Sequence, residues 1–296
     1  MTGKRKIWHW LVLAALSIIW GTSYILMKKG LESFSPYQIA GLRIFISSLC
    51  LLPVALRNLP KITGGNFLSL LVIGLSGSAI PAFLFPLAET KIDSSLAGML
   101  NSLSPVFTLV LGIMFYNRKA IGSQITGVVL GLTGAAGLLY NGSLRFNAFG
   151  LLVVLATLLY GISVNEVSRI KNLNGLQITS LSLFIMSPFA IILLMTSDFH
   201  AAAGSSSFIL NLGYIAILSV FGTALALVLF YILIRDTSPV FGVTVNYFIP
   251  VVATLWGITD NERFIYYMLI PLGLLFCGVY LISKPAPLKK PAGIVK

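Results

Sequence analysis

The amino-acid sequence predicts an all-α polytopic membrane protein with ten transmembrane helices, arranged as two inverted five-helix repeats. Three observations lead to this fold class: a composition too apolar for a water-facing surface, ten long apolar stretches, and a similarity between the two halves of the chain. Of the 296 residues, 57% are hydrophobic and 9% are charged, with a mean hydropathy of +0.96. Globular domains carry about 25% charged residues. The composition therefore excludes a soluble enzyme, a soluble nucleic-acid-binding domain and a disordered chain.

A helix needs about 20 apolar residues to cross the hydrocarbon core of a bilayer. Ten such stretches follow one another, and the short connections between them leave no room for a soluble domain. In order, they are 7–28, 36–57, 66–88, 93–115, 121–140, 148–168, 175–196, 208–234, 238–258 and 264–283. A transmembrane β-barrel would show strands of about 10 residues that alternate apolar and polar side chains. Long, continuously apolar runs indicate helices instead.

The formal net charge of +12 indicates the orientation of the chain in the membrane rather than a nucleic-acid partner. With the N-terminus in the cytoplasm, 14 of the 20 Lys and Arg residues fall on the cytoplasmic side and five fall outside. The cytoplasmic set is Lys4, Arg5, Lys6, Arg57, Lys61, Arg118, Lys119, Arg169, Lys171, Arg235, Lys284, Lys289, Lys290 and Lys296, and the outer set is Lys28, Lys29, Lys91, Arg145 and Arg263. By the positive-inside rule, we expect a multi-pass membrane protein with both termini in the cytoplasm.

The two halves of the chain share several residues at nearly fixed offsets. Five pairs lie 145 positions apart: Gly77 with Gly222, Phe85 with Phe230, Asn101 with Asn246, Pro105 with Pro250, and Gly112 with Gly257. We therefore expect one repeat over 1–145, with helices 1–5, and a second over 146–296, with helices 6–10 and a short basic C-terminal tail. Because five is odd, the second repeat is inverted in the membrane. Many secondary transporters are built in this way, with a substrate site near the midplane.

The first helix of each repeat carries a cluster of polar and aromatic side chains. The matching segments are Trp20 to Ser23 and Tyr160 to Ser163, 140 positions apart. Trp20 lies about 13 Å from the outer end of its helix by helical rise, which is too deep for an interfacial aromatic belt. We expect these side chains to line a central cavity: Trp20, Ser23, Tyr24, Tyr160 and Ser163.

The second helix contains Arg43, the only charged side chain well inside a span. Charged groups are costly to bury in a bilayer. Arg43 could reach toward the membrane surface or bond to a backbone carbonyl, which would be a structural role. It could also bind a carboxylate or phosphate group of a substrate, for which a guanidinium is well suited. The sequence leaves both open.

The fourth and ninth helices share an asparagine four positions before a proline, Asn101 with Pro105 and Asn246 with Pro250. A mid-span proline removes a backbone hydrogen bond, so the carbonyls at the two asparagines need other partners, and both prolines are candidate hinges. The asparagines could form a paired polar site on the cavity, with Tyr247 joining the same wall. They could instead only hold helices together by interhelical hydrogen bonds.

The fifth helix contains a GxxxG pattern, Gly127 to Gly131, which Gly134 and Gly137 extend. Small residues at this spacing allow helices to approach closely. We expect packing within the bundle rather than a dedicated dimer motif. The protein is therefore expected to be a monomer or a weak homodimer, with membrane lipids and a small-molecule substrate as its partners and no nucleic acid.

Titratable side chains are sparse in the predicted spans. Glu166 falls near the cytoplasmic end of its helix, and Glu89 and Asp93 bracket an outer loop. Because no carboxylate is predicted at mid-membrane, the sequence does not support proton coupling, although it does not exclude it. The chain also lacks a nucleophile with a base or a clustered set of metal ligands, so we expect no enzyme, no cofactor and no metal.

Together, these residues resemble the drug/metabolite transporter superfamily, specifically its EamA type. The resemblance rests on Trp20-Gly21-Thr22-Ser23-Tyr24, on Pro36 with Arg43, and on Leu100-Asn101-Ser102-Leu103-Ser104-Pro105 with Gly112. It covers nearly the whole chain, with one EamA-like unit in each half. One departure is the stretch Tyr116-Asn117-Arg118-Lys119, where the family often has Gly-Glu after the fourth helix; the second half has Asn261-Glu262.

The resemblance implies a ten-helix inner-membrane transporter, usually an exporter of amino acids or other small metabolites. It also implies that the first four helices of each unit surround the cavity and that the fifth is peripheral. We expect alternating access, in which the two repeats rock around a midplane site. Facilitated diffusion, exchange and proton antiport all remain open. The alternative function is a facilitative channel or a lipid scramblase.

Overall fold

The computed structural model describes residues 7–118, 120–140, 147–262 and 266–283. These residues form helices and no strand, and nine of the helical segments are long and apolar enough to cross a membrane. The nine segments are Ile7–Gly30, Pro36–Lys61, Gly64–Glu89, Ser94–Phe115, Gly122–Leu139, Gly150–Arg169, Gly175–Met195, Phe208–Asp236 and Pro239–Thr259. The protein is therefore an all-helical polytopic membrane protein, as the sequence predicts.

The predicted tenth span, 264–283, differs from the other nine. It consists of a short 3-10 turn, η5 (Tyr266–Met268), followed by α15 (Leu269–Ser283), which has 15 residues. At 1.5 Å per residue this helix is about 22 Å long, which is shorter than a ~30 Å hydrocarbon core. Residues 263–265 and 284–296 lie outside the described part of the chain, so the tenth crossing stays a prediction. The predicted boundary between the repeats, at 145, and most of the predicted cytoplasmic tails lie outside it as well.

Several spans are divided into shorter elements. In chain order the helices are α1 (Ile7–Gly30), α2 (Pro36–Asn58), η1 (Leu59–Lys61), α3 (Gly64–Gly74), η2 (Leu75–Ala79), α4 (Ile80–Glu89), α5 (Ser94–Asn101), α6 (Ser104–Phe115), α7 (Gly122–Leu139), α8 (Gly150–Arg169), α9 (Gly175–Met195), α10 (His200–Ala203), α11 (Phe208–Ile217), η3 (Leu218–Leu225), α12 (Ala226–Asp236), α13 (Pro239–Gly242), η4 (Val243–Tyr247) and α14 (Ile249–Thr259). The segments η2 and η3 are π-helical, and η4 is 3-10. π-helical turns occur often at functional sites.

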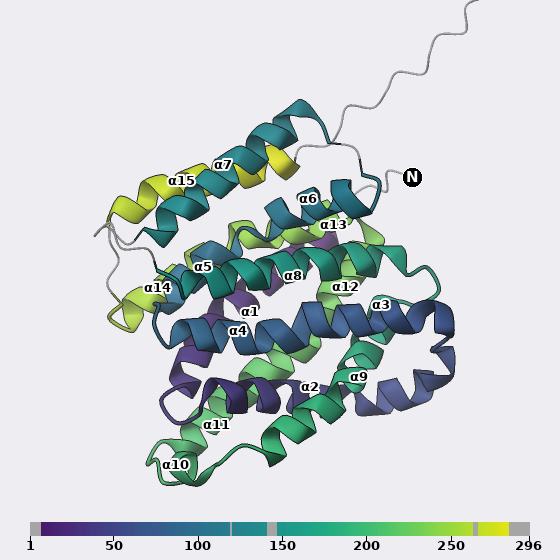
Figure 1. Ribbon diagram of the computed structural model, residues 1–296, viewed down its shortest axis with the longest axis vertical. Helices are drawn as coiled ribbons and strands as arrows, with labels where there is room; N and C mark the ends of the chain where they lie inside the picture. The colour runs from purple at the N-terminus through teal and green to yellow at the C-terminus, as the bar shows by residue number, and fades with distance from the viewer. Residues whose placement is uncertain (1–6, 119, 141–146, 263–265, 284–296) are drawn as a thin grey trace, which may run out of the picture.

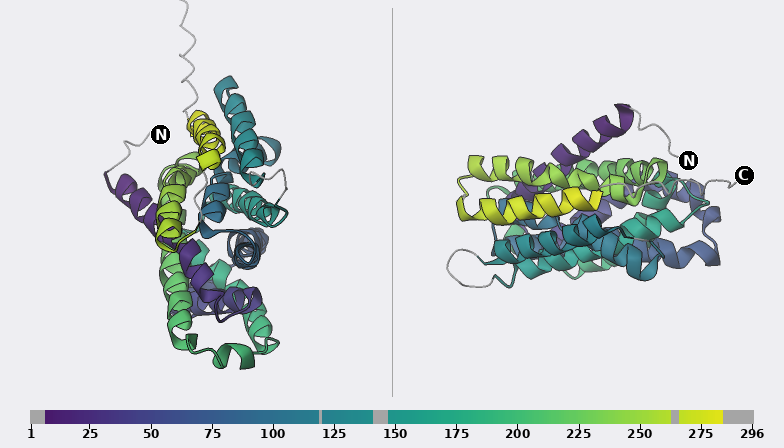
Figure 2. Two further views of the ribbon diagram at one scale, coloured as in Figure 1. Left: turned by 90° about the vertical axis from the view of Figure 1, so that its left-hand side faces the viewer. Right: turned by 90° about the horizontal axis from the view of Figure 1, so that it is seen from above.

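The helices run side by side, with α7 and α15 packed together at one edge of the bundle and α2 and α9 packed together toward the other (Figure 1). Between these edges, α1 packs on α12 and α14, and α8 packs on α4 and α6. Figure 2 shows the same bundle along and across the helices, with α15 beside α7 in both views. The fifth helix is thus peripheral, as the resemblance implies.

The helices α2 and α9 begin in the same way and bind each other at both ends. Ser35 and Asn174 cap them, and each cap exchanges hydrogen bonds with a glutamine three residues later. Such a capping box satisfies backbone donors that the first helical turn leaves free. The same glutamines also reach across: Gln38 Nε2 donates to the Asp198 carbonyl over 2.7 Å, and Gln177 Nε2 donates to Asn58 Oδ1 over 3.1 Å. The two helices are therefore antiparallel, with the start of each against the end of the other.

The two predicted hinge prolines do not kink continuous helices. Pro105 lies in the first turn of α6 and Pro250 in the first turn of α14, where a proline fits because the backbone N–H has no intrahelical partner. The breaks come just before them. The carbonyls that we expected to be free are also bonded, Asn101 O by Ser104 Oγ over 2.8 Å and Asn246 O by Ser102 Oγ over 2.9 Å. Serine hydroxyls therefore supply the hydrogen bonds that these two carbonyls need.

The glycine stripe of α7 faces α15 of the same chain. A Cβ added at Gly127 would lie 2.6 Å from the Gly278 carbonyl oxygen, and one added at Gly134 would lie 2.5 Å from the Pro271 carbonyl oxygen. The two backbones are therefore too close for any side chain between them. This confirms that the GxxxG pattern serves packing within the bundle.

We expect Gly278→Val to destabilise the α7–α15 pair. A Cβ at Gly278 would lie 2.6 Å from both Gly127 O and Gly131 N, which are backbone atoms that cannot move aside individually. Overpacking of this kind costs about 1–3 kcal/mol. Thermal unfolding in detergent measures the effect, and Gly273→Val on the same helix is the control because a Cβ there meets nothing within 4 Å. Equal melting temperatures for the two variants would contradict this account of the contact.

Candidate functional site

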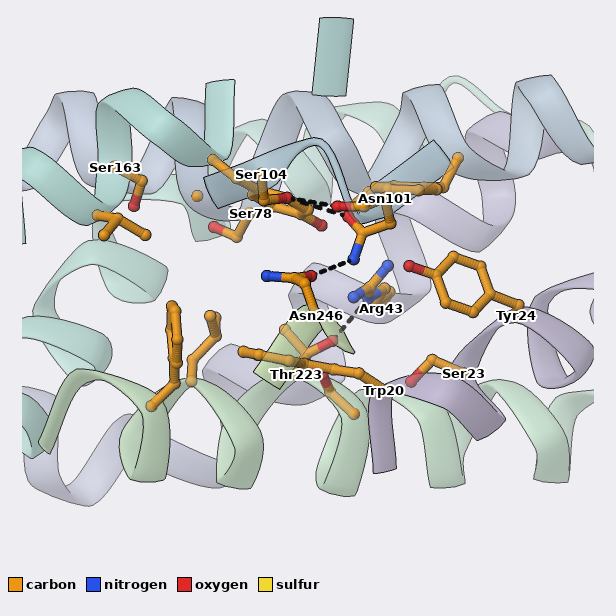
Figure 3. Close-up of a pocket in the computed structure, with 18 of the residues that line it drawn as sticks. Trp20, Ser23, Tyr24, Arg43, Ser78, Asn101, Ser104, Ser163, Thr223 and Asn246 are labelled. Atoms are coloured by element: carbon orange, nitrogen blue, oxygen red, sulfur yellow. Dashed lines mark hydrogen bonds between the residues drawn. The ribbon is translucent and has the colours of Figure 1, made fainter. Parts of the chain in front are cut away.

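A cavity of about 70 Å³ lies in the middle of the bundle, with room for a few water molecules. Its wall combines polar and aromatic side chains from both halves of the chain (Figure 3). The residues that line it are Trp20, Ser23, Tyr24, Met27, Arg43, Ile44, Gly77, Ser78, Ala82, Phe85, Asn101, Ser104, Tyr160, Ser163, Val164, Gly222, Thr223, Leu227, Phe230, Tyr231, Val243 and Asn246.

The structure brings eight of the nine residues that the sequence predicts for substrate binding to this cavity: Trp20, Ser23, Tyr24, Arg43, Asn101, Tyr160, Ser163 and Asn246. Tyr247 does not line it. Its hydroxyl donates to Ser283 Oγ over 3.2 Å, and its ring lies beside Phe276. Successive residues of a helical turn point in different directions, so the residue next to Asn246 faces α15 instead.

Asn101 and Asn246 bond directly to each other across the cavity wall. Asn101 Nδ2 donates to Asn246 Oδ1 over 2.8 Å, and Asn246 Nδ2 donates to the Val243 carbonyl over 2.9 Å. Figure 3 shows the two amides reaching toward each other, with the Tyr24 hydroxyl and the Arg43 guanidinium pointing into the same region. In this conformation the pair forms the interhelical hydrogen bond that the sequence allowed, at a position that also faces the cavity.

Arg43 is 8% exposed and points inward rather than toward the membrane surface. Its Nε donates to Thr223 Oγ1 over 2.6 Å, and Nη1 lies 3.7 Å from Met27 Sδ. Among the described residues, no carboxylate lies within ion-pair distance of this guanidinium. A buried cation without an anionic partner carries a large desolvation cost, which a bound anion would offset. Arg43 therefore places a positive charge on the cavity wall that no carboxylate of the described residues pairs with.

Four of the aromatic residues of the wall form two crossed pairs. Trp20 of the first half lies edge-on to Phe230 of the second, with ring centroids 4.9 Å apart. Tyr160 of the second half stacks on Phe85 of the first at 5.9 Å. Phe85 and Phe230 are matching positions in the two halves of the sequence, and so are their partners Tyr160 and Trp20. Each half therefore contributes the same kind of contact to the other half. The sequence already marked both phenylalanines as repeat anchors, and this signal could have placed them on the wall.

The π-helical segments approach the first helices in the same crossed manner. A Cβ at Gly77 of η2 would lie 2.4 Å from Ser163 Oγ, and a Cβ at Gly222 of η3 would lie 2.7 Å from Ser23 Oγ. The carbonyl of Gly222 also accepts a 3.0 Å hydrogen bond from Trp20 Nε1. A Cβ at either glycine would therefore force the facing serine hydroxyl to move. Thr223, the neighbour of Gly222, is the residue that holds Arg43, and sequence reasoning missed it.

A network of charged side chains joins the helices at the end of the bundle that carries Lys28. Glu262 accepts hydrogen bonds from Lys28 Nζ at 2.6 Å, from the backbone N–H groups of Ser94 and Ser95 at 2.8 and 3.0 Å, and from Ser94 Oγ at 2.7 Å. Burial by itself would raise the pKa of the Glu262 carboxyl, but these donors lower that pKa to about 2. The network connects α1, the start of α5 and the segment after α14.

We expect Glu262→Gln to lower the melting temperature at pH 7 by roughly 5 °C, as the loss of a charge-assisted hydrogen bond predicts. Because the pKa of Glu262 is lower in the folded protein than its ordinary value of 4.5, its stabilisation is complete above pH 4.5. That stabilisation is lost as the pH falls from 4.5 toward 2. The melting temperatures of the two proteins should therefore converge over this range. Glu32→Gln is the control, since that side chain is 52% exposed. A difference that stays constant down to pH 2 would contradict the assignment.

A second polar network joins the helices at the opposite end of the bundle. Glu166 of α8 accepts hydrogen bonds from Ser69 Oγ at 2.5 Å and from the Tyr116 hydroxyl at 2.7 Å. Arg235 donates to the backbone carbonyls of Ile170 and Lys171. This end gathers basic residues that the sequence assigns to the cytoplasmic side. Among the described residues, no three His, Cys, Asp or Glu side chains are grouped so that they could hold a metal ion.

Comparison with known proteins gives one family and several relatives. Residues 7–140 and 148–284 each match the EamA-like transporter family. The chain is 28% identical over 278 residues to the "Uncharacterized inner membrane transporter YedA" of Escherichia coli (strain K12), which covers 92% of this chain and 89% of that protein. It is 23% identical over 285 residues to an "Uncharacterized transporter" of Archaeoglobus fulgidus, covering 93% and 98%.

A shorter match and a solved structure complete the comparison. The "Probable amino-acid metabolite efflux pump" of Escherichia coli (strain K12) is 31% identical over 126 residues, which is 42% of this chain and 40% of that protein. A solved structure titled "Crystal structure of protein" superposes with a TM-score of 0.64 at 15% identity, covering 92% of this chain and 94% of the other. That likeness supports the fold alone.

Proposed function

The chain belongs to the EamA-like transporter family, and from this membership we propose that it is a secondary transporter of the inner membrane that exports amino acids or similar small metabolites. The observation that carries the substrate class is Arg43, a buried guanidinium in the central cavity with no carboxylate at ion-pair distance among the described residues. A substrate carboxylate would supply the missing anion and accept two parallel hydrogen bonds. The names of the relatives from Escherichia coli agree with an inner-membrane location and with amino-acid export.

The rest of the cavity wall suits an amino acid. The crossed pairs of Trp20 with Phe230 and of Tyr160 with Phe85 offer apolar surface for a side chain. The Asn101–Asn246 pair offers amide donors and acceptors to a polar group. We propose that the protein works as a monomer or as a weak homodimer.

We propose that the protein works by alternating access between two inverted repeats of five helices each. The crossed aromatic pairs, the two π segments and the two capping boxes all recur at equivalent positions of the halves, which supports a two-fold relation. The breaks before Pro105 and Pro250 are the proposed hinges, because the chain already changes helix there. The Asn101–Asn246 bond joins the two breaks and would tighten or open with them.

The distribution of basic residues supports both termini in the cytoplasm. Arg118, Arg169 and Arg235 gather around Glu166, Ser168 and the end of α8, while Lys28 and Lys29 take part in the network at the other end. The positive-inside rule makes the first of these ends cytoplasmic.

A counterflow screen in proteoliposomes tests the proposed function. Vesicles containing the full chain are loaded in turn with unlabelled amino acids, nucleosides or quaternary amines, and the entry of the matching labelled compound is followed. Saturable counterflow of at least one carboxylate-containing amino acid is the expected result. Counterflow of quaternary amines alone would contradict a role for Arg43 in recognising carboxylates. Single-channel conductance, or lipid flipping without solute counterflow, would favour the channel or scramblase alternative.

A further inference from the structure

Glu89 is a buried carboxyl to which the proposed transport site assigns no role. It is the last residue of α4 and is 5% exposed, although the sequence places it beside an outer loop. Both of its carboxylate oxygens are buried, and neither has a hydrogen-bond partner. Among the described residues, no other carboxylate has two buried oxygens that both lack a hydrogen-bond partner. An isolated ionised carboxylate is far more costly to bury than a neutral acid.

The charges around Glu89 do not offset the free-energy cost of burying its ionised carboxylate. Electrostatic contact reaches it from Lys28 and Tyr24 on α1, from Arg43 on α2 and from Glu262 after α14. Lys28 is already bonded to Glu262 and lies 3.7 Å from Asp93, and Arg43 donates to Thr223. The other elements packed against α4 contribute Tyr160 from α8 and Asp93 at the start of α5. Lys28 is thus paired with other acids, neither cation donates a hydrogen bond to Glu89, and the nearby acids oppose a second negative charge.

Glu262 provides the contrast within the same end of the bundle. It receives four hydrogen bonds and stays ionised with a pKa of about 2, whereas Glu89 receives none. Two neighbouring carboxyls in such different environments are suited to different roles, because the environment of Glu262 favours the ionised form and that of Glu89 favours the neutral acid. Glu89 also lies within electrostatic reach of both the Lys28 network and the Arg43 cation of the cavity. It therefore links the end of the bundle to the site.

We propose that Glu89 is a proton-binding site that couples closure of the central cavity to the uptake of one proton, with the proton bound in the conformation described here. The step is a simple association: a carboxylate oxygen of Glu89 takes a proton from water when the bundle is open and becomes a neutral acid as the bundle closes. The proton returns to water when the cavity next opens, and no other bond forms or breaks. A pH gradient then biases the direction of the transport cycle, because the open and closed conformations bind different numbers of protons.

Infrared spectroscopy tests the protonation state without any substrate. The full chain in lipid at pH 7.5 should show the C=O stretching band of a protonated carboxylic acid, because a neutral, buried Glu89 keeps its proton at this pH. The band should be missing in Glu89→Gln and present in the control variant Glu32→Gln, whose side chain is 52% exposed. Absence of the band from the unmodified protein overturns the proposal even if Glu89→Gln fails to fold. Persistence of the band in a folded Glu89→Gln protein overturns it as well.

Transport tests the coupling, which rests on the proposed function. A mixture of radiolabelled amino acids is the probe, first in counterflow at equal pH on both sides and then with an imposed pH gradient. The unmodified protein and Glu32→Gln should respond severalfold to the gradient, whereas Glu89→Gln should show counterflow without a response. A full gradient response in Glu89→Gln overturns the coupling. Failure of every protein to move the probe would count against amino-acid transport, while the infrared band still decides the protonation of Glu89.

Discussion

Replacing Arg43 by alanine is expected to lower amino-acid counterflow by about tenfold to a hundredfold in a protein that still folds. A charge-assisted hydrogen bond is worth about 1.5–3 kcal/mol, and each 1.4 kcal/mol is a factor of ten. The side chain is buried in the cavity wall, so the variant loses both the positive charge and the donors that face the substrate. Its removal also frees the hydroxyl of Thr223. Initial rates of counterflow at several substrate concentrations measure the effect.

The lysine variant separates charge from geometry at this position. Arg43→Lys keeps a positive charge but lacks the planar fork that binds a carboxylate through two hydrogen bonds. We therefore expect it to recover part of the lost rate, mainly by a lower KM than that of Arg43→Ala. Arg57→Ala on the same helix is the matched control, since this side chain is exposed at the end of α2. Unchanged kinetics in Arg43→Ala would show that the guanidinium has only a structural role.

Removing either amide of the Asn101–Asn246 pair is expected to lower transport about tenfold or more. The two side chains are 5% and 4% exposed and share one 2.8 Å hydrogen bond, so the loss of one leaves the other with a buried, unsatisfied group. Because both variants break the same bond, the double variant should lose little more than either single variant. Counterflow rates normalised to the amount of folded protein measure this non-additivity.

A buried asparagine elsewhere separates transport from stability. Asn165 of α8 donates to the carbonyls of Thr108 and Gly161 and does not line the cavity. Asn165→Ala should therefore lower the melting temperature without changing the KM for the substrate. Unaltered transport in both Asn101→Ala and Asn246→Ala would refute the role that we assign to the pair.

Sequence reasoning succeeded where the signal was local or repeated. Apolar runs alone located the nine long helices that the described residues form. The recurrence of Asn101 as Asn246, and of the segment at Trp20 as the segment at Tyr160, selected residues from four helices that meet at one cavity. Hydropathy fixes which segments enter the membrane, and an internal repeat identifies the positions that two related halves use in common.

Prediction from the sequence failed where the outcome depended on the direction of a side chain or on its neighbours in the folded protein. Tyr247 is adjacent to Asn246 in the chain but bonds to Ser283 on α15, because adjacent helical residues point apart. Pro105 begins a helix instead of bending one. Glu89 was placed at the edge of an outer loop, yet it is the last residue of α4 and its side chain is buried. None of these features leaves a trace in composition or spacing.

By itself, the sequence determined the membrane class of the protein, the helical spans and most of the residues around the cavity, because burial in lipid and the repeat leave their marks along the chain. Only the tertiary structure decided what those residues do to one another. Arg43 meets Thr223 180 positions away, and Asn101 meets Asn246 145 positions away. Glu89 meets no donor at all among the described residues, whereas Glu262 meets four. Whether a buried polar group is satisfied depends on side chains from distant segments, and only the packing of the helices brings those segments together.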